Sequence, residues 1–417
     1  MRRISMIVVA VVLGGGVCVF GSGAARASGH APSPPPPHGT VLASLSDPGG
    51  TAGDSFGNSV AVDGTTAVVG AYATNFQQGA VYIYAKGASA WPTSPTVTLH
   101  DPNVSTGDLF GNSVAIDGTT IVVGSDGYNA GEGLVYVYVK GSNGWPKKPT
   151  LTLHDPGNTQ FDFFGSSVAT AEGRNIVVGS AAAYPGAGSA YIYTKGTTGW
   201  PKKPTATLAD PAATAGDSFG GAVAVSATTA VVGAYNGDAA YVYVKGSSGW
   251  PTSPTTSLAD PGGQSYDFFG FSVAIDESST IVVGANSTNT VGAAYIYSRG
   301  TSGWPSTPTT TLADPPQTTN DDFGYAVAVD GSNLVVGSDG PPSFFGIDQM
   351  DGAVYYFTKG PGGWSTTPTT TVADPQAMPG DRFGTAVSVE TGAVVVGAFG
   401  TFSSQIGGIG AAYVLAP

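Results

Sequence analysis

The chain has 417 residues, of which 10% are charged, and it contains 63 glycines, 30 prolines and one cysteine. Its formal net charge is −13, and an acidic surface repels nucleic acid and anionic lipid, so we expect neither as a partner. A single cysteine excludes a fold held by intrachain disulfides. Valine, alanine, tyrosine and phenylalanine are too frequent for a disordered chain. The composition therefore indicates a folded protein whose stability comes from packing and hydrogen bonds.

The first predicted segment is an export signal over residues 1–27. Two arginines precede an apolar run over residues 4–20, and small residues flank a cleavage site after Ala27. An uncleaved membrane anchor is the weaker alternative, because three consecutive glycines interrupt a run that is already short for a membrane span. Cleavage would remove the only cysteine, Cys18. We therefore predict a secreted or cell-surface protein with no membrane span in its mature form, which begins with a proline-rich linker over residues 28–39.

From residue 40 to residue 417 one pattern occurs seven times, with copies 50 to 60 residues apart. Each copy opens with Asp-Pro, at Asp47, Asp101, Asp155, Asp210, Asp260, Asp314 and Asp374. A Phe-Gly pair follows, at Phe56, Phe110, Phe164, Phe219, Phe269, Phe323 and Phe383. A Val-Val-Gly triplet comes next, ending at Gly70, Gly124, Gly179, Gly233, Gly284, Gly337 and Gly397. A repeat of this length, built of short alternating strands, indicates one β-sheet blade per copy, with the blades closed into a ring.

Within a copy, short apolar runs and turn residues predict four strands. In the first copy these runs occupy residues 59–62, 67–69, 80–84 and 96–99. Asp63 and Gly64 form a tight hairpin turn between the first two runs. Pro102 marks the end of the fourth, because proline donates no hydrogen bond to a ladder. We expect the phenylalanine of Phe-Gly to pack between neighbouring blades and its glycine to permit close backbone approach.

The two ends of the repeat region complement each other. Residues 40–45 align with the fourth strand of a copy, whereas the last copy stops at its third strand, over residues 412–415. Pairing these segments would supply the missing outer strand of the last blade and remove two unpaired edges. The predicted fold is therefore all-β: a seven-bladed β-propeller of four-stranded antiparallel blades over residues 40–417, closed by the N-terminal strand completing the C-terminal blade.

The repeat resembles a known family. Its motifs are Asp-x-Phe-Gly-x-x-Val-Ala, Val-Val-Gly-Ala and Gly-Ala-x-Tyr-x-Tyr, and they are similar to the FG-GAP repeat in the bacterial form that adds a tryptophan turn and a Leu-x-Asp-Pro strand. The resemblance implies a propeller like the head domain of integrin α subunits and a role in extracellular recognition. Integrin-type repeats also carry a calcium loop in the first hairpin, but Asp63-Gly64 offers one carboxylate where calcium needs about six to eight oxygens. We therefore expect no metal or other cofactor.

Acidic side chains occur mostly at positions fixed by the repeat. An aspartate stands two residues before each phenylalanine, at Asp54, Asp108, Asp162, Asp217, Asp267, Asp321 and Asp381. One interpretation is a ring of carboxylates that binds a metal or a cationic ligand. The other, favoured by the sevenfold repetition, is that each aspartate bonds local backbone amides. His100 and His154 occupy equivalent positions without a zinc-binding pattern around them, and we predict no catalytic residue.

Departures from the repeat point to a ligand site. The connections between the second and third strands lie on the same face of the ring as the connections that lead from one copy to the next. The longest connections between second and third strands are those of the sixth and seventh copies. These two connections contain aromatic and acidic residues, namely Phe344, Phe345, Asp348, Asp351, Phe399 and Phe402. Exposed aromatic side chains beside carboxylates on a rigid scaffold suit ligand binding. The alternative is that the loops fold over each other and bury their own phenylalanines.

The favoured function is an exported, non-catalytic recognition or adhesion module that binds an extracellular protein or glycan on this face, as a monomer. The second is a polysaccharide-acting hydrolase or lyase with its site at the central funnel, for which Asp339, Asp348 and Asp351 are the candidate acids. The third is a passive surface or envelope protein.

Overall fold

The computed structural model describes residues 36–51, 53–182, 185–263, 266–276, 279–287, 291–315, 322–340, 352–376, 381–400, 402–403, 406–407 and 410–417. Residues 37–417 form one compact unit.

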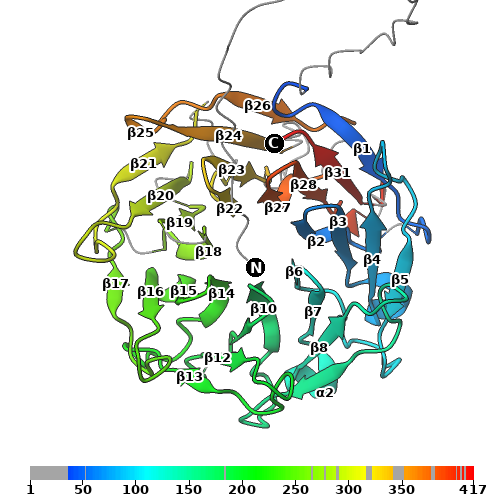
Figure 1. Cartoon of the computed structure of the whole chain (residues 1–417), viewed down its shortest axis with the longest axis horizontal. Helices are drawn as coiled ribbons and strands as arrows, with labels where there is room; N and C mark the ends of the chain where they lie inside the picture. Colours follow the sequence, from blue (N-terminus) through cyan, green and yellow to red (C-terminus); the bar gives the residue numbers. More distant parts are fainter. Residues whose placement is uncertain are drawn as a thin grey trace, which may run out of the picture. The chain divides into compact units, whose positions relative to one another are not determined.

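Seven antiparallel sheets, or blades, are arranged in a ring, and each contains four main strands (Figure 1). Blade one runs outward through β2 (Phe56–Asp63), β3 (Thr66–Ala71), β4 (Ala80–Ala85) and β5 (Val97–His100). The innermost strands of blades two to six are β6 (Val114–Asp117), β10 (Phe164–Ala171), β14 (Phe219–Val225), β18 (Phe269–Ile275) and β22 (Ala326–Asp330). Their second strands are β7 (Thr120–Ser125), β11 (Asn175–Ser180), β15 (Thr229–Ala234), β19 (Thr280–Ala285) and β23 (Asn333–Ser338). Their third strands are β8 (Leu134–Val139), β12 (Ser189–Thr194), β16 (Ala239–Val244), β20 (Ala293–Ser298) and β24 (Ala353–Gly360). Their outer strands are β9 (Leu151–His154), β13 (Ala206–Leu208), β17 (Thr256–Leu258), β21 (Thr310–Ala313) and β26 (Thr370–Ala373).

Blade seven confirms the predicted closure, because its strands come from both ends of the repeat region. It consists of β27 (Phe383–Glu390), β28 (Ala393–Ala398), β31 (Ala411–Leu415) and β1 (Val41–Leu45). The outer strand β1 pairs antiparallel with β31, with Leu45 opposite Ala412. The innermost strand β2 contacts both β6 and β27, so the ring of innermost strands is continuous.

The first strand of blade one is longer than the sequence predicted. The prediction began at Ser59, whereas β2 begins at Phe56, which pairs with Ala71. The pairing register then shifts before Val60. The strand was located from its alternation of apolar and small residues. Because the register shift interrupts this alternation, the sequence did not predict the first residues of the strand.

The phenylalanine of Phe-Gly packs between blades, as predicted. Phe110 is fully buried in a cluster that includes Val81 of blade one and Val123 of blade two, and its ring centroid lies 5.5 Å from that of Tyr136. The glycine of Val-Val-Gly is required by close backbone approach: a Cβ on Gly70 would lie 2.1 Å from the carbonyl oxygen of Gly111 in the next blade. Neighbouring blades therefore touch through backbone as well as side chains.

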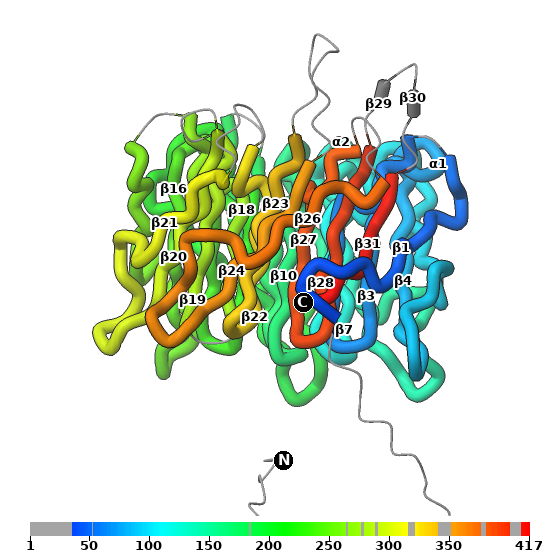
Figure 2. Tube along the Cα trace, turned by 90° about the horizontal axis from the view of Figure 1, so that it is seen from above, coloured from blue at the N-terminus to red at the C-terminus, as the bar shows by residue number. Residues whose placement is uncertain are grey.

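The connections fall on two faces of the ring (Figure 2). We call one the loop face: it consists of the described residues that link the second strand to the third within a blade, such as 72–79, and the fourth strand to the first strand of the next blade, such as 101–113. Its 2→3 connections include the short turns α1 (Thr74–Gln77), α2 (Tyr128–Gly131) and η1 (Tyr235–Gly237) and the hairpin of β29 (Phe402–Ser403) with β30 (Ile406–Gly407). The hairpin face carries the 1→2 and 3→4 connections, among them β25 (Gly363–Trp364), which pairs with β24.

Candidate functional site

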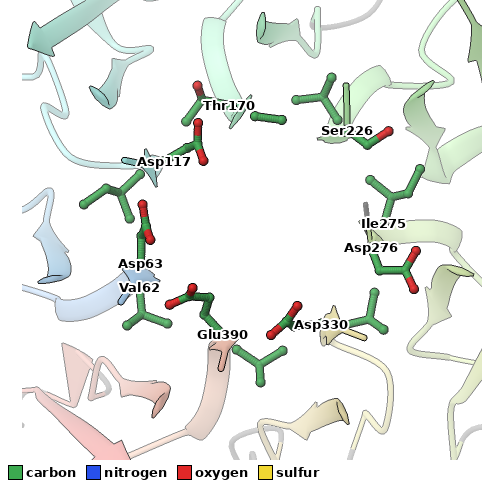
Figure 3. Close-up of a pocket in the computed structure, with 14 residues that line it drawn as sticks. Val62, Asp63, Asp117, Thr170, Ser226, Ile275, Asp276, Asp330 and Glu390 are labelled. Carbon is green, nitrogen blue, oxygen red and sulfur yellow. The ribbon is translucent and has the colours of Figure 1, made fainter. Parts of the chain in front are cut away.

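A cavity of about 390 Å³ occupies the centre of the ring at the hairpin face. The last residues of the innermost strands and the residues that follow them line it, and Figure 3 shows their polar members around the opening: Asp63, Asp117, Thr170, Ser226, Asp276, Asp330 and Glu390. Carboxylates thus come from five of the seven blades. Among the described residues, no group of three or more His, Cys, Asp or Glu side chains is arranged to hold a metal ion.

Hydrogen bonds between blades engage the carboxylates of this cavity. The Asp63 carboxylate accepts the backbone N–H of Gly118 in the next blade, and the Asp117 carboxylate accepts that of Gly173. Burial raises the pKa of the Asp117 carboxyl, although the Gly173 amide opposes this effect. Asp330 accepts a hydrogen bond of 3.0 Å from the Thr391 hydroxyl. Since Asp63, Asp117 and Asp330 each bind the neighbouring blade, these acids have a structural role that the sequence analysis missed.

The predicted ligand site in blades six and seven lies largely outside the described residues. Phe344, Phe345, Asp348 and Asp351 belong to that part of the chain, and so does the side chain of Phe402, although its backbone is part of β29. The prediction that these residues form one ligand site therefore stays a prediction.

Phe399, the one residue of the predicted ligand site whose side chain is described, is half-buried and belongs to a network on the loop face. The Arg382 guanidinium carbon lies 4.8 Å from the centroid of the Phe399 ring and 5.7 Å from that of Tyr325. Arg382 also forms an ion pair with Asp339, whose side chain is fully buried. Phe399 therefore stacks on an arginine that is already neutralised, an arrangement that holds the ring in place.

A series of aromatic rings continues from Tyr325 around the loop face. The centroid of Tyr325 in blade six lies 4.9 Å from that of Phe271 in blade five. Phe271 in turn lies 5.4 Å from Tyr235 of blade four, and Tyr235 lies 6.3 Å from Phe268. Each of these rings is partly exposed. Blades four to seven thus present a series of fixed aromatic side chains.

The most exposed large apolar side chains also lie on the loop face. Phe76 is 82% exposed, Val104 66%, Phe161 56% and Tyr266 76%. Of the other described residues, only Val41 on the edge strand β1 joins them, at 42%. All four loop-face residues have left-handed backbone conformations, with φ of 61°, 56°, 66° and 72° in the same order. A bulky or β-branched residue rarely adopts such a φ, because its Cβ clashes with the backbone.

Comparison between copies shows that two of these residues replace glycine. Phe161 and Tyr266 immediately precede the aspartate of Asp-x-Phe-Gly in blades three and five. The equivalent residues of blades one, two and four are Gly53, Gly107 and Gly216, with φ of 88°, 87° and 81°. The sequence analysis looked for differences in loop length and missed both aromatics, but a bulky residue at a glycine position is a signal that the sequence contains.

Basic side chains gather on the hairpin face. Every lysine lies on the hairpin face, in a 3→4 connection or, for Lys359, at the end of the third strand that leads into it: Lys86, Lys140, Lys147, Lys148, Lys195, Lys202, Lys203, Lys245 and Lys359. Several of them rest on the tryptophan of the same connection; the Lys86 ammonium lies 5.7 Å from the Trp91 centroid. Among the described residues of the loop face, Arg382 is the only lysine or arginine, and it is bound to Asp339. The loop face is therefore acidic.

The predicted role of the aspartate two residues before Phe is seen in blade four, where Asp217 Oδ1 accepts the backbone N–H of Phe219 at 3.3 Å. The aspartate of Asp-Pro accepts local backbone N–H groups, for example that of Gly49 at 2.8 Å from Asp47 Oδ1. His100 and His154 are exposed at the ends of outer strands. Neither histidine is part of a described metal or catalytic cluster.

Sequence comparison agrees with the architecture. The family profile described as FG-GAP repeat matches residues 40–84, 94–138, 204–249 and 253–297. These segments contain strands of blades one, two, four and five. No curated protein matches the chain. Among the described residues, no helix is both long and apolar enough to cross a membrane. With seven blades of the predicted topology and four segments that match the family, the chain is an FG-GAP seven-bladed β-propeller.

Proposed function

We propose that the protein is an exported, non-catalytic recognition module that binds a basic polypeptide on its loop face. The single observation that carries this proposal is the set of exposed apolar side chains at left-handed backbone positions, Phe76, Val104, Phe161 and Tyr266. Isolated exposed apolar residues are common on proteins. These four differ because each combines exposure with a backbone conformation that its residue type disfavours.

The backbone cost makes a purely structural role for these residues difficult. A residue in a sparsely populated φ/ψ region costs roughly 1–3 kcal/mol, and other copies show that glycine fits the positions of Phe161 and Tyr266. Neither side chain recovers this cost by burial, since both are more than half exposed. A ligand that covers them would recover it by removing apolar surface from water.

The loop that holds Tyr266 is fixed before any ligand arrives. The Asp238 carboxylate accepts the backbone N–H of Tyr266 at 2.9 Å and that of Phe268 at 2.9 Å. Asp238 comes from the preceding blade, so this bond ties the 4→1 connection to the 2→3 turn beside it. A side chain presented on such a fixed loop loses little conformational entropy on binding.

The charge of the loop face favours a basic partner. Its described basic residue, Arg382, is neutralised by Asp339, whereas aspartates surround every 4→1 connection. An acidic surface raises the association rate of a cationic ligand and disfavours an anionic one. Exposed phenylalanine and tyrosine then provide apolar anchors for side chains of that ligand.

A peptide array tests the proposal. The protein without residues 1–27 is applied to peptides that share the same apolar residues but carry lysine and arginine, neutral residues or glutamate. We expect binding to the basic series, weakening as salt rises because exposed charges are screened. Equal binding to the three series, or binding to none of them, would contradict the proposal. The double variant Lys147→Glu/Lys148→Glu, on the hairpin face, is the control and should bind as the unaltered protein does.

A further inference from the structure

Aspartates of the two repeated series lie seven residues apart in sequence, and described pairs of them meet in space. A Cβ placed on Gly49 would lie 3.4 Å from Asp47 Oδ1 and 3.3 Å from Asp54 Oδ2. A Cβ placed on Gly157 would lie 3.3 Å from Asp155 Oδ2 and 3.4 Å from Asp162 Oδ2. The carboxyl groups of Asp-Pro and of Asp-x-Phe-Gly therefore converge on one point at the junction between two blades.

In blade two, the first aspartate of the pair has donors for both oxygens and the second does not. Asp101 Oδ1 accepts the backbone N–H of Asn103 at 3.0 Å, and its Oδ2 accepts that of Ser105 at 3.1 Å. Asp108 is 3% exposed, yet no described donor reaches its Oδ2. Two ionised carboxylates this close and this buried repel each other, and a buried acceptor without a donor is costly.

The same arrangement recurs in blade five. Asp260 Oδ1 accepts the backbone N–H of Gly262 at 2.8 Å. Its partner Asp267 is 3% exposed, and Asp267 Oδ2 has no donor among the described residues. Something positive must therefore lie between the carboxyl groups of each pair at neutral pH.

The groups that face these pairs are acidic or neutral. In blade two, Tyr136 and Tyr138 of β8 face Asp101, and Tyr136 also faces Asp108; His100, next in sequence, is exposed.

Blades one and five show the same surroundings. In blade one, Tyr82 of β4 faces both carboxyl groups and Tyr84 faces Asp47. In blade five, Asp238 adds a third negative charge near Asp267. No lysine or arginine contributes to the electrostatics of any of these pairs.

We propose that the aspartate pairs of blades one to five are proton-binding sites, in each of which one proton is shared between the carboxyl group of Asp-x-Phe-Gly and the carboxylate of Asp-Pro. A proton fits the geometry better than calcium, because each pair offers at most four carboxylate oxygens, some of which already accept amide hydrogens, while calcium takes about six to eight. The shared proton supplies the donor that Asp108 Oδ2 and Asp267 Oδ2 otherwise lack.

The electrostatics of the pairs support this assignment. Burial and the neighbouring Asp101 carboxylate raise the pKa of Asp108 to about 7, and burial and Asp210 do the same for Asp217. Burial and Asp47 raise the pKa of Asp54 to about 6. An aspartate in the unfolded chain has a pKa of about 3.9.

The sign of the resulting pH dependence is opposite to that of most proteins. Between about pH 4 and the raised pKa, the folded protein holds protons that the unfolded chain releases, so the free energy of unfolding falls as pH rises through this range. The stabilisation is fully present at about pH 4 and is lost by about pH 7. Most proteins instead lose stability on acidification, because their ionised carboxylates are paired in the folded state.

Two measurements on the protein without residues 1–27 test the proposal. Calorimetry at about pH 5.5, in buffers of different ionisation enthalpy, counts the protons exchanged on unfolding; we expect net release. The melting temperature should fall by about 5 °C or more from pH 5 to pH 8. Net proton uptake on unfolding, or a melting temperature that rises over this range, would overturn the proposal.

A matched pair of variants locates the effect. Asp108→Asn keeps the shape of the side chain, provides its own donor and removes the shared proton, so fewer protons should be released and the melting temperature at pH 8 should rise. Glu172→Gln removes one carboxylate at an exposed residue outside any pair. This variant should change neither the number of protons released on unfolding nor the melting temperature at pH 8. Equal behaviour of the two variants contradicts the proposal.

Metal binding is the competing occupant, and it has its own signature. If calcium raises the melting temperature of the unaltered protein at pH 8, and a chelator lowers it, while Asp108→Asn weakens the response, the pairs are metal sites and the proposal is wrong. Wild-type melting temperatures that are the same with calcium and with chelator support the shared proton.

Discussion

At the scale of single residues, backbone conformation separates architecture from function. The residue just before Phe-Gly is left-handed in every blade, at Ser55, Leu109, Phe163, Ser218, Phe268, Asp322 and Arg382. A feature repeated in all copies belongs to the fold. Phe161 and Tyr266 differ because they occupy left-handed positions where other copies have glycine, and a disfavoured residue that only some copies contain requires a local explanation.

Replacing Tyr266 by glycine should not destabilise the protein. Relief of the left-handed conformation is worth about 1–2 kcal/mol, and the greater freedom of glycine in the unfolded chain offsets roughly 0.4–1 kcal/mol of this. The 76% exposed side chain contributes little burial. Denaturant unfolding of Tyr266→Gly should therefore give an unchanged or slightly higher free energy of unfolding. A loss above about 1 kcal/mol would show that Tyr266 is a packing residue.

Sequence reasoning predicted the roles of repeated residues well and those of unique residues poorly. Phe110 was placed between blades because seven equivalent phenylalanines must share one environment. The ion pair of Arg382 with Asp339 was not predicted, because their separation in sequence contains no repeat signal. The aspartate pairs were missed for another reason: both series were recognised, but spacing alone does not show that the chain turns back between Asp101 and Asp108.

At the scale of elements, the closure of the ring depends on one short strand. The strand β1 pairs with β31, and just beyond the pairing Gly39 N donates to Ala416 O at 2.9 Å. Leu45 is 3% exposed and joins the core beside blade one. The sequence predicted this strand because residues 40–45 match the outer strands of other copies. Its register and its buried leucine were visible only in the structure.

Deleting residues 40–46 should lower the melting temperature markedly. The deletion exposes the edge of β31 and removes the buried Leu45 side chain, whose burial alone is worth about 1.5–3 kcal/mol. Thermal unfolding followed by circular dichroism measures the effect. Deleting residues 28–34, a segment of equal length outside the propeller, is the control. If both deletions give the same melting temperature, β1 does not stabilise the ring.

At the scale of the whole molecule, the propeller has two chemically different faces. The hairpin face carries the lysines and a central cavity of about 390 Å³, while the loop face carries buried acids and exposed apolar residues. The Asp63 and Asp117 carboxylates accept backbone N–H groups of the next blade, and these bonds hold the cavity wall together. The two faces therefore differ in what they offer a ligand: a cavity lined by carboxylates on the hairpin face and exposed apolar side chains on the loop face.

The proposed export of the protein gives a prediction for the mature chain. Expressed with residues 1–27 in a secreting bacterial host, the protein should appear in the medium or at the cell surface and begin at Ser28. N-terminal sequencing of the exported protein decides the matter. A chain that still begins at Met1 would show that the apolar run is not a cleaved signal.

The most direct test of the proposed recognition surface uses the double variant Phe161→Gly/Tyr266→Gly with a basic peptide selected on the array. Both substitutions install the residue that other copies have, so the fold should remain intact. Isothermal titration calorimetry should show affinity reduced by tenfold or more, or about 1.4 kcal/mol, while Val41→Thr, which alters the exposed apolar residue on the edge strand, should leave affinity unchanged. Unchanged affinity of the folded double variant would place the binding site elsewhere on the propeller and contradict the account.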